Sequence, residues 1–163
     1  MTTEAEVSVI MPGSYDPVTV GHLDMIRRVA EVEDEVYVVV FVNENKKCMF
    51  SLSDRVNMLL IATEGLDNVL VSFSVGRVVD YMREHGISTI VKGYRNDADL
   101  LWEREQAEYN MKHGGYETRL ILSDERYGSV SSTEVRHRIE SGEDFSELVP
   151  GGVMEYISSL DEK

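Results

Sequence analysis

Short runs rich in β-branched residues alternate with amphipathic stretches along the whole chain, and this alternation limits the possible fold more than any other feature. The runs are mostly apolar at every position, which is typical of strands covered on both faces of a sheet. Strand, helix and strand in regular succession indicate a parallel sheet with right-handed crossovers. We therefore expect an α/β fold with a doubly wound, Rossmann-like, five-stranded parallel sheet. The expected strands are 7–11, 36–42, 69–73, 88–92 and 118–122, and the expected helices are roughly 22–32, 52–63, 76–85, 97–113, 131–141 and 151–160.

Local signals at the ends of the helical stretches agree with this fold. Ser51-x-x-Asp54 and Ser131-x-x-Glu134 resemble capping boxes at helix starts. Because the chain has 163 residues and shows no repeat or flexible linker, we expect one domain spanning residues 1–163. Glycines stand where helix ends favour a left-handed residue, at Gly86, Gly114 and Gly142.

The composition indicates a soluble protein with an acidic surface. Apolar residues make up 42% of the chain and the mean hydropathy is −0.23. The net charge of −14 disfavours nucleic acid and anionic membranes as partners, because both are bound through Lys and Arg. The acidic N-terminus does not resemble a signal peptide, and the lone Cys48 cannot form an internal disulfide, so we expect a cytoplasmic protein. An anionic ligand would require a local convergence of cations.

The expected fold indicates where such a ligand would bind. Open α/β sheets bind ligands beyond the carboxyl ends of the strands, where the strand order reverses. The sequence does not give the strand order. In the common order 3-2-1-4-5, the reversal brings the loop at residues 12–21 beside the stretch from Lys92 to Arg95.

The first of these loops, PGSYDPVTVGH at residues 12–22, is longer than a plain connection requires. It contains no lysine, so it is not a P-loop, and the chain lacks the G-x-G-x-x-G fingerprint of dinucleotide-binding folds. Ser14 offers a hydroxyl, and His22 stands at a helix start, where backbone N–H groups favour phosphate. Asp16-Pro17 is interpreted as a turn. A proline-rich turn without a ligand is the alternative interpretation.

Cations and hydroxyl groups follow other expected strands. Lys46 and Lys47 follow the second strand, and Lys92 and Arg95 follow the fourth. The hydroxyl-rich segment 127–133 either caps a helix or cradles phosphate oxygens. No catalytic triad can be named, and the histidines and Cys48 show no metal-ligand spacing, so we expect no metal-ligating residues.

Two of these motifs resemble a known family. Thr19-Val-Gly-His22 resembles the (T/H)xGH element of the nucleotidyltransferase superfamily, and the segment from Val130 to Arg136 resembles its ISSTxxR element. Within that superfamily the chain is most similar to the bacterial phosphopantetheine adenylyltransferases, over about residues 8–160. The similarity includes NENKKCMFSLSDRV and the helix DADLLWEREQAEYNMKH.

The resemblance implies a reaction and a set of site residues. The implied reaction transfers AMP from ATP to 4′-phosphopantetheine, with Mg²⁺, to give dephospho-coenzyme A and pyrophosphate in coenzyme A biosynthesis. It also implies a homohexamer and feedback inhibition by coenzyme A. The implied catalytic residue is His22, which would stabilise charge on the α-phosphate. The implied substrate-binding residues are Ser14, Lys46, Val78 and Lys92, and the implied ATP-binding residues are Ser14, Tyr15, His22, Gly93, Tyr94, Arg95, Glu103, Tyr127, Gly128, Ser129, Val130, Ser131, Ser132 and Thr133.

Several positions depart from the family pattern. Lys92 stands in place of the usual arginine, Tyr15 in place of phenylalanine, and Val20 in place of asparagine, while Trp102 is usually Tyr or Phe. Two other functions stay open. A nicotinamide or nicotinate mononucleotide adenylyltransferase shares the serine-rich element but usually has HxGH. A non-catalytic ATP-binding α/β module would carry a late glycine-rich phosphate loop.

Overall fold

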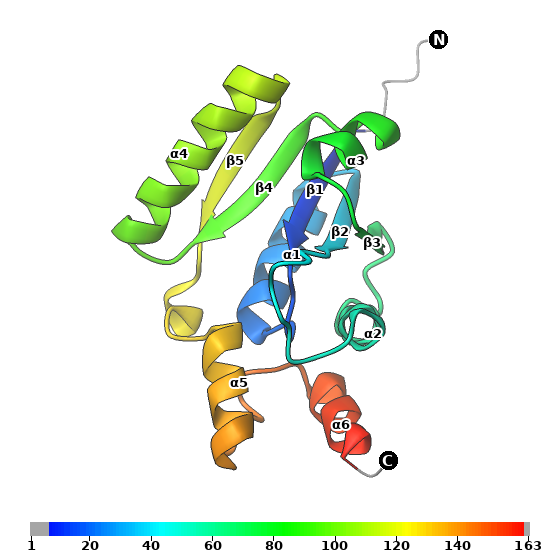
Figure 1. The fold of residues 1–163 in the computed structure, drawn as a ribbon, viewed down its shortest axis with the longest axis vertical. Helices are drawn as coiled ribbons and strands as arrows, with labels where there is room; N and C mark the ends of the chain where they lie inside the picture. The colour runs from blue at the N-terminus through cyan, green and yellow to red at the C-terminus, as the bar shows by residue number, and fades with distance from the viewer. Residues whose placement is uncertain (1–6, 162–163) are drawn as a thin grey trace.

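The computed structural model describes residues 7–161, which form a five-stranded parallel sheet with helices on both faces (Figure 1). The strand order is β3-β2-β1-β4-β5, so the expected α/β class is confirmed. The strands are β1 (Ser8–Gly13), β2 (Glu35–Phe41), β3 (Val69–Ser74), β4 (Thr89–Tyr94) and β5 (Glu117–Leu122). The helices are α1 (Val20–Val32), α2 (Leu52–Ala62), α3 (Val78–His85), α4 (Asp97–Gly114), α5 (Ser132–Ser141) and α6 (Gly151–Leu160), with a short 3₁₀ turn at Glu125–Tyr127.

The central strand β1 is buried on both faces, as its continuous apolar sequence predicts. Val9 and Met11 belong to the larger core, which also contains Ile26 of α1 and Met58 of α2. Ile10 points to the opposite face and belongs to a smaller core with residues of α3. The alternation of side chains along β1 therefore divides the interior into two layers.

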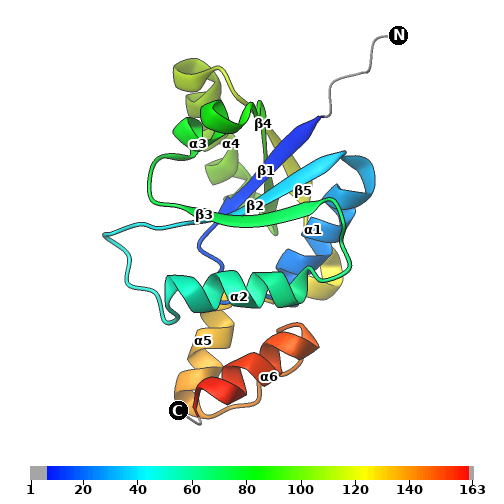
Figure 2. The same cartoon turned by 90° about the vertical axis from the view of Figure 1, so that its right-hand side faces the viewer.

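The helices cover the two faces of the sheet. Figure 2 shows α3 and α4 on one side of the sheet, with α1 and α2 on the other. The reversal of strand order falls between β1 and β4, which pair in parallel through Val9 with Thr89 and Ile10 with Ile90. The carboxyl ends of β1 and β4 therefore lie next to each other. In the part of the chain from 7 to 161, none of the helices combines the length and apolarity that a membrane crossing requires.

The helix ends agree with their sequence signals, with one correction. The Ser51 and Ser131 hydroxyls accept hydrogen bonds from the backbone N–H groups three residues later, as expected for N-caps. Gly86 and Gly142 have left-handed backbones with φ of 67° and 75°. The expectation for Gly114 is wrong, because α4 includes it and the left-handed residue is Gly115, with φ of 69°.

Candidate active site

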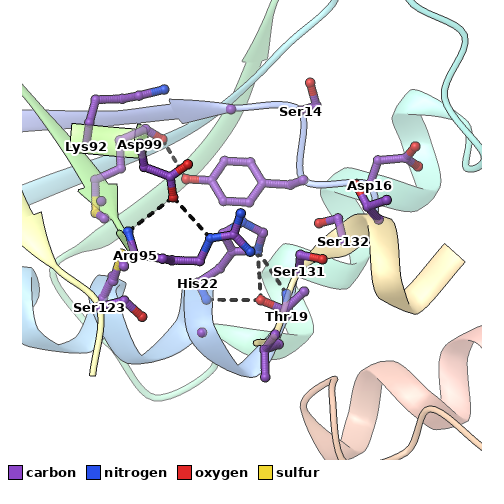
Figure 3. Close-up of a pocket in the computed structure, with 18 of the residues that line it drawn as sticks. Ser14, Asp16, Thr19, His22, Lys92, Arg95, Asp99, Ser123, Ser131 and Ser132 are labelled. Carbon is purple, nitrogen blue, oxygen red and sulfur yellow. Dashed lines mark hydrogen bonds and ion pairs between the residues drawn. The ribbon is translucent and has the colours of Figure 1, made fainter. Parts of the chain in front are cut away.

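A pocket of about 380 Å³ lies at the carboxyl ends of β1 and β4 (Figure 3). It is formed by the loop after β1, the end of β4, the start of α4 and the segment leading into α5. Its volume is in the range of small-molecule sites. His22 and Arg95 both line it, so the expected meeting of the two loops is confirmed.

The pocket brings together most of the residues that the sequence predicted. Those that line it are Ser14, Tyr15, His22, Lys46, Lys92, Gly93, Arg95, Glu103, Tyr127, Val130, Ser131, Ser132 and Thr133. Four predicted residues are outside this lining: Val78 packs with the smaller core at the start of α3, while Tyr94, Gly128 and Ser129 belong to segments that border the pocket.

His22 is held by the first turn of its own helix. Thr19 is the N-cap of α1; its hydroxyl accepts the His22 backbone N–H at 3.2 Å, and its backbone N–H donates to His22 Nδ1 at 3.0 Å. Because a backbone N–H can only donate, Nδ1 must be unprotonated, and the proton of the neutral ring is on Nε2. The imidazole is therefore oriented as a hydrogen-bond donor through Nε2.

The surroundings keep His22 neutral. Burial lowers its pKa to about 4, and the positive charges of Arg95 and Lys92 lower it in the same direction. The rings of His22 and Tyr15 also pack in a T-shaped arrangement, with 5.1 Å between the ring centroids. At neutral pH, His22 thus donates a hydrogen bond without carrying a charge.

Tyr15 shapes the loop between β1 and α1. Its backbone is left-handed, with φ of 47°, which is uncommon for a non-glycine residue and costs of the order of 1 kcal/mol. The buried side chain donates from its hydroxyl to the Met11 carbonyl at 2.9 Å, and burial raises the pKa of this phenol. The tyrosine that departs from the family pattern therefore makes a hydrogen bond that phenylalanine would lack.

The opposite wall carries cations that are paired with carboxylates of α4. Lys92 Nζ lies 3.8 Å from Glu103, and Arg95 donates to one oxygen of Asp99 from both its backbone N and its Nε, at 3.2 Å each. Among residues 7–161, no hydrogen bond ties the terminal nitrogens of the Arg95 guanidinium. Those nitrogens can therefore bind a phosphate in the bidentate manner.

Gly93 allows a close approach between β4 and α1. A Cβ atom at this position would overlap the side chain of Met25, which also lines the pocket. Glycine therefore allows Met25 to pack against β4 at the edge of the pocket.

The serine-rich segment before α5 uses several of its hydroxyls within the protein. Ser131 caps α5, Ser132 Oγ donates to the Pro17 carbonyl at 2.7 Å, and Thr133 Oγ1 accepts from Arg136 at 3.1 Å. The helix-capping interpretation is thus confirmed for Ser131. The hydrogen bond to Pro17 also fixes this segment against the loop after β1.

The sequence analysis assigned no site role to three charged residues of the lining, Asp16, Asp99 and Arg136, although Arg136 ends the element that resembles ISSTxxR. Asp16 and Pro17 form a turn, as predicted, and the Asp16 side chain is in addition 3% exposed and accepts hydrogen bonds from the Met49 and Phe50 amides. The four-residue spacing of Arg95 and Asp99 was an available signal for that pair. The contacts of Asp16 join residues more than 30 positions apart, and no local pattern indicates them.

The described residues 7–161 contain no cluster of three or more acidic, His or Cys side chains that could hold a metal ion. The carboxylates in the pocket face basic groups: Asp99 faces Arg95, Glu103 faces Lys92, and Asp16 faces Arg136. Mg²⁺ commonly binds through substrate phosphates with few protein ligands. The donor set fits an ion that is carried by the phosphates of a nucleotide.

The Cytidylyltransferase-like family model matches residues 10–138, which include most of β1, the pocket loops and most of α5. The chain belongs to this family. It is also 39% identical over 145 residues to the phosphopantetheine adenylyltransferase of Corynebacterium glutamicum (strain R), covering 88% of this chain and 91% of that protein. The phosphopantetheine adenylyltransferase of Thermobifida fusca (strain YX) is 40% identical over 147 residues, covering 90% of each chain. These matches place the chain among the phosphopantetheine adenylyltransferases of the Cytidylyltransferase-like family.

Proposed function

We propose that the protein transfers AMP from ATP to 4′-phosphopantetheine, giving dephospho-coenzyme A and pyrophosphate in coenzyme A biosynthesis. The observation that carries this proposal is the neutral, Nε2-protonated His22 in one pocket with Lys46, Lys92 and Arg95. In an acidic protein this local group of cations suits two phosphate-bearing substrates. The similarity to the adenylyltransferases supports the same reaction.

The proposed arrangement gives each substrate its own set of binding groups in the pocket. Lys46, whose Nζ donates to Ser14 Oγ at 3.1 Å, and Lys92 bind the phosphopantetheine phosphate. Arg95 and the segment 127–133 bind the ATP phosphates, with the Tyr15 amide, Gly93, Tyr94 and Glu103 contributing to the nucleotide site. Val78 borders the acceptor.

The chemistry in this arrangement requires no protein base. The attacking phosphate is already an anion, so the protein aligns it with the α-phosphorus and offsets the charge that develops there. His22 Nε2–H donates to an oxygen of the α-phosphate in the transition state. Mg²⁺, bound to the ATP phosphates, supplies further charge neutralisation when present.

We extend the proposal to the assembly and its control. Residues 1–163 form one nucleotidyltransferase domain, which acts in the cytoplasm as a homohexamer inhibited by coenzyme A. The helix α4 supports association, because none of its residues is buried and it exposes 63% of Leu101, 60% of Trp102 and 59% of Tyr109. Apolar side chains gathered on one helix in this way are typical of a protein interface.

Pyrophosphate release from Mg-ATP tests the proposed reaction. We expect release that depends on 4′-phosphopantetheine, with dephospho-coenzyme A as the second product. Nicotinamide mononucleotide and nicotinate mononucleotide serve as alternative acceptors, and release with either of these alone would contradict the proposal. ATP binding without acceptor-dependent release would instead indicate a non-catalytic module.

A further inference from the structure

Asp16 is the most enclosed charged group of the pocket, and the proposed reaction assigns it no role. Its side chain is 3% exposed. A carboxylate buried to this degree is costly unless hydrogen bonds and opposite charge compensate it. The partners of Asp16 therefore indicate what the residue does.

The two carboxylate oxygens bind the loop between β2 and α2. Oδ2 accepts the Met49 backbone N–H at 2.8 Å, and Oδ1 accepts the Phe50 backbone N–H at 2.9 Å. This loop also carries Lys46, whose Nζ donates to Ser14 Oγ. The side chain of Asp16 thus fixes one cation-bearing loop against the loop that carries Ser14.

The backbone carbonyl of Asp16 accepts a hydrogen bond from Arg136 of α5. Arg136 Nη1 donates to the Asp16 carbonyl at 2.7 Å and lies 3.7 Å from Oδ2. Its Nη2 donates to Thr133 Oγ1, so the guanidinium connects Asp16 to the hydroxyl-rich segment. The side chain and the backbone of Asp16 therefore contact two different walls of the pocket.

A buried cation of α2 strengthens the connection between the loop of Asp16 and the loop of Lys46. Arg55 of α2 is 5% exposed; its Nη1 donates to the Ser14 carbonyl at 3.0 Å and its Nε to the Phe50 carbonyl at 3.2 Å. The loop after β1 and the loop after β2 are thus joined by bonds in both directions. Lys46 is carried by the second of these loops and its Nζ donates to Ser14 Oγ of the first, so the position of Lys46 depends on the spacing between the two loops.

We propose that Asp16 is a positioning residue that sets the spacing between the acceptor-binding and nucleotide-binding groups. Its carboxylate holds the loop of Lys46, and its carbonyl, through Arg136, holds Thr133. This assignment rests on the proposed function for the identity of the two substrates. It predicts that a change of the carboxylate acts mainly on the loop of Lys46, whose two backbone N–H groups it accepts, with a smaller effect on Arg136 through the 3.7 Å contact to Oδ2. A change of Arg136 acts mainly on Thr133.

Steady-state kinetics on two variants separate the connections. Asp16→Asn keeps the backbone carbonyl but replaces one acceptor oxygen with an NH₂ group that faces a backbone N–H. We expect KM for 4′-phosphopantetheine to rise by about tenfold, the equivalent of one net hydrogen bond, with KM for ATP changed by less than about threefold. Arg136→Met removes the donors to Asp16 and Thr133, and it should raise KM for ATP more than KM for the acceptor.

Asp144→Asn is the matched control. Asp144 also accepts a backbone N–H, from Ser146 at 2.9 Å, but it lies outside the pocket lining. This variant should leave both KM values unchanged. An equal rise of both KM values in Asp16→Asn and Arg136→Met would show that Asp16 has only a structural role and would overturn the proposal.

Amide hydrogen exchange tests the connection without any substrate. Exchange at Met49 and Phe50 should be faster in Asp16→Asn than in the wild type and unchanged in Asp144→Asn. Unchanged exchange at both amides overturns the proposal.

If the wild type fails to use 4′-phosphopantetheine, the proposed function is wrong, while the exchange rates still decide the positioning role. If Asp16→Asn does not fold, the KM ratio in Arg136→Met decides it.

Discussion

The two walls of the pocket hold their polar groups in different ways. On the wall formed by β1 and α1, His22 is fixed by two hydrogen bonds within the Thr19 capping box, and its ring is partly buried and uncharged. On the wall formed by β4 and α4, Lys92 and Arg95 are charged, partly exposed and paired with Glu103 and Asp99. Hydrogen bonds to Thr19, including one from its backbone N–H, position His22 on the first wall. Ion pairs between side chains position the two cations of the second wall.

This difference suggests a division of tasks. A fixed neutral donor requires no rearrangement when charge develops during a reaction, which favours transition-state stabilisation. Cations paired with carboxylates near solvent can exchange those partners for a phosphate at modest cost, which favours binding. Changes to the first wall should therefore reduce kcat, and changes to the second should raise KM.

Replacing His22 has the largest expected effect. His22→Ala should lower kcat by about 10²–10³, as for the loss of one preorganised donor, while ATP affinity changes far less. Rapid-quench turnover and calorimetric ATP binding measure the two quantities. His113→Ala, on the exposed surface of α4, is the control and should be unaffected. Normal turnover in His22→Ala would contradict the assignment of transition-state stabilisation to the wall formed by β1 and α1.

Changes at Arg95 should act mainly on binding. Arg95→Ala should raise KM for ATP by about 10- to 100-fold, because it removes a charged hydrogen-bonding group. Asp99→Asn retains the Arg95 guanidinium but weakens the charged hydrogen bond that orients its Nε. We therefore expect a smaller rise in KM for ATP, with kcat almost unchanged. Initial-rate measurements with ATP varied test both variants. A loss confined to kcat would mean that this wall also acts on the transition state.

The low pKa of His22 should make the stability of the protein depend on pH. The folded protein keeps His22 neutral down to about pH 4, whereas the unfolded chain protonates it near pH 6.5. The unfolded state therefore binds more protons in this window, and the free energy of unfolding should fall by about 2–3 kcal/mol as pH drops from 6.5 to 4.

Urea denaturation at several pH values measures this effect. His22→Gln serves as the reference, because glutamine can keep the capping box but does not titrate. The two proteins should differ in the slope of stability against pH between 4 and 6.5. Parallel slopes would contradict the assignment of a neutral His22.

Lys92→Arg has the smallest expected effect. If this position requires only a phosphate-binding cation, kcat/KM should stay within a factor of about three, because arginine keeps the charge and can still reach a phosphate. Initial-rate assays in which ATP and the acceptor are varied separately would detect a change in either site. A large loss would show that the geometry around Glu103 is specific to lysine.

The sequence predicted the scaffold well because each strand and helix carries its own local signal. The continuous apolar runs predicted all five parallel strands, and the reversal of order brought His22 and Arg95 into one pocket as expected. Helix α1 begins at Val20, two residues earlier than expected, because Thr19 rather than a later residue is the N-cap. The misplaced helix end at Gly114 has a similar cause, since two adjacent glycines compete for one left-handed position.

The connections between the loops were not predictable in the same way. A carboxylate that accepts from Met49 and Phe50 looks, in sequence, like the Asp-Pro of a turn. The hydrogen bond from Arg136 to Asp16 was not predictable either, because it joins residues 120 positions apart. Such contacts depend on how the strands are ordered, and the strand order is the property that local patterns do not contain.

The place of β1 in the middle of the sheet has a consequence for how heat inactivates the protein. The loop that carries Ser14 continues directly from this strand and leads into α1 and His22, and the strand is bordered by β2 and β4 and covered on both faces. Fraying that begins at β3 or β5 reaches the loop only after the neighbouring strands have separated. This wall of the pocket therefore keeps its shape until the whole sheet melts.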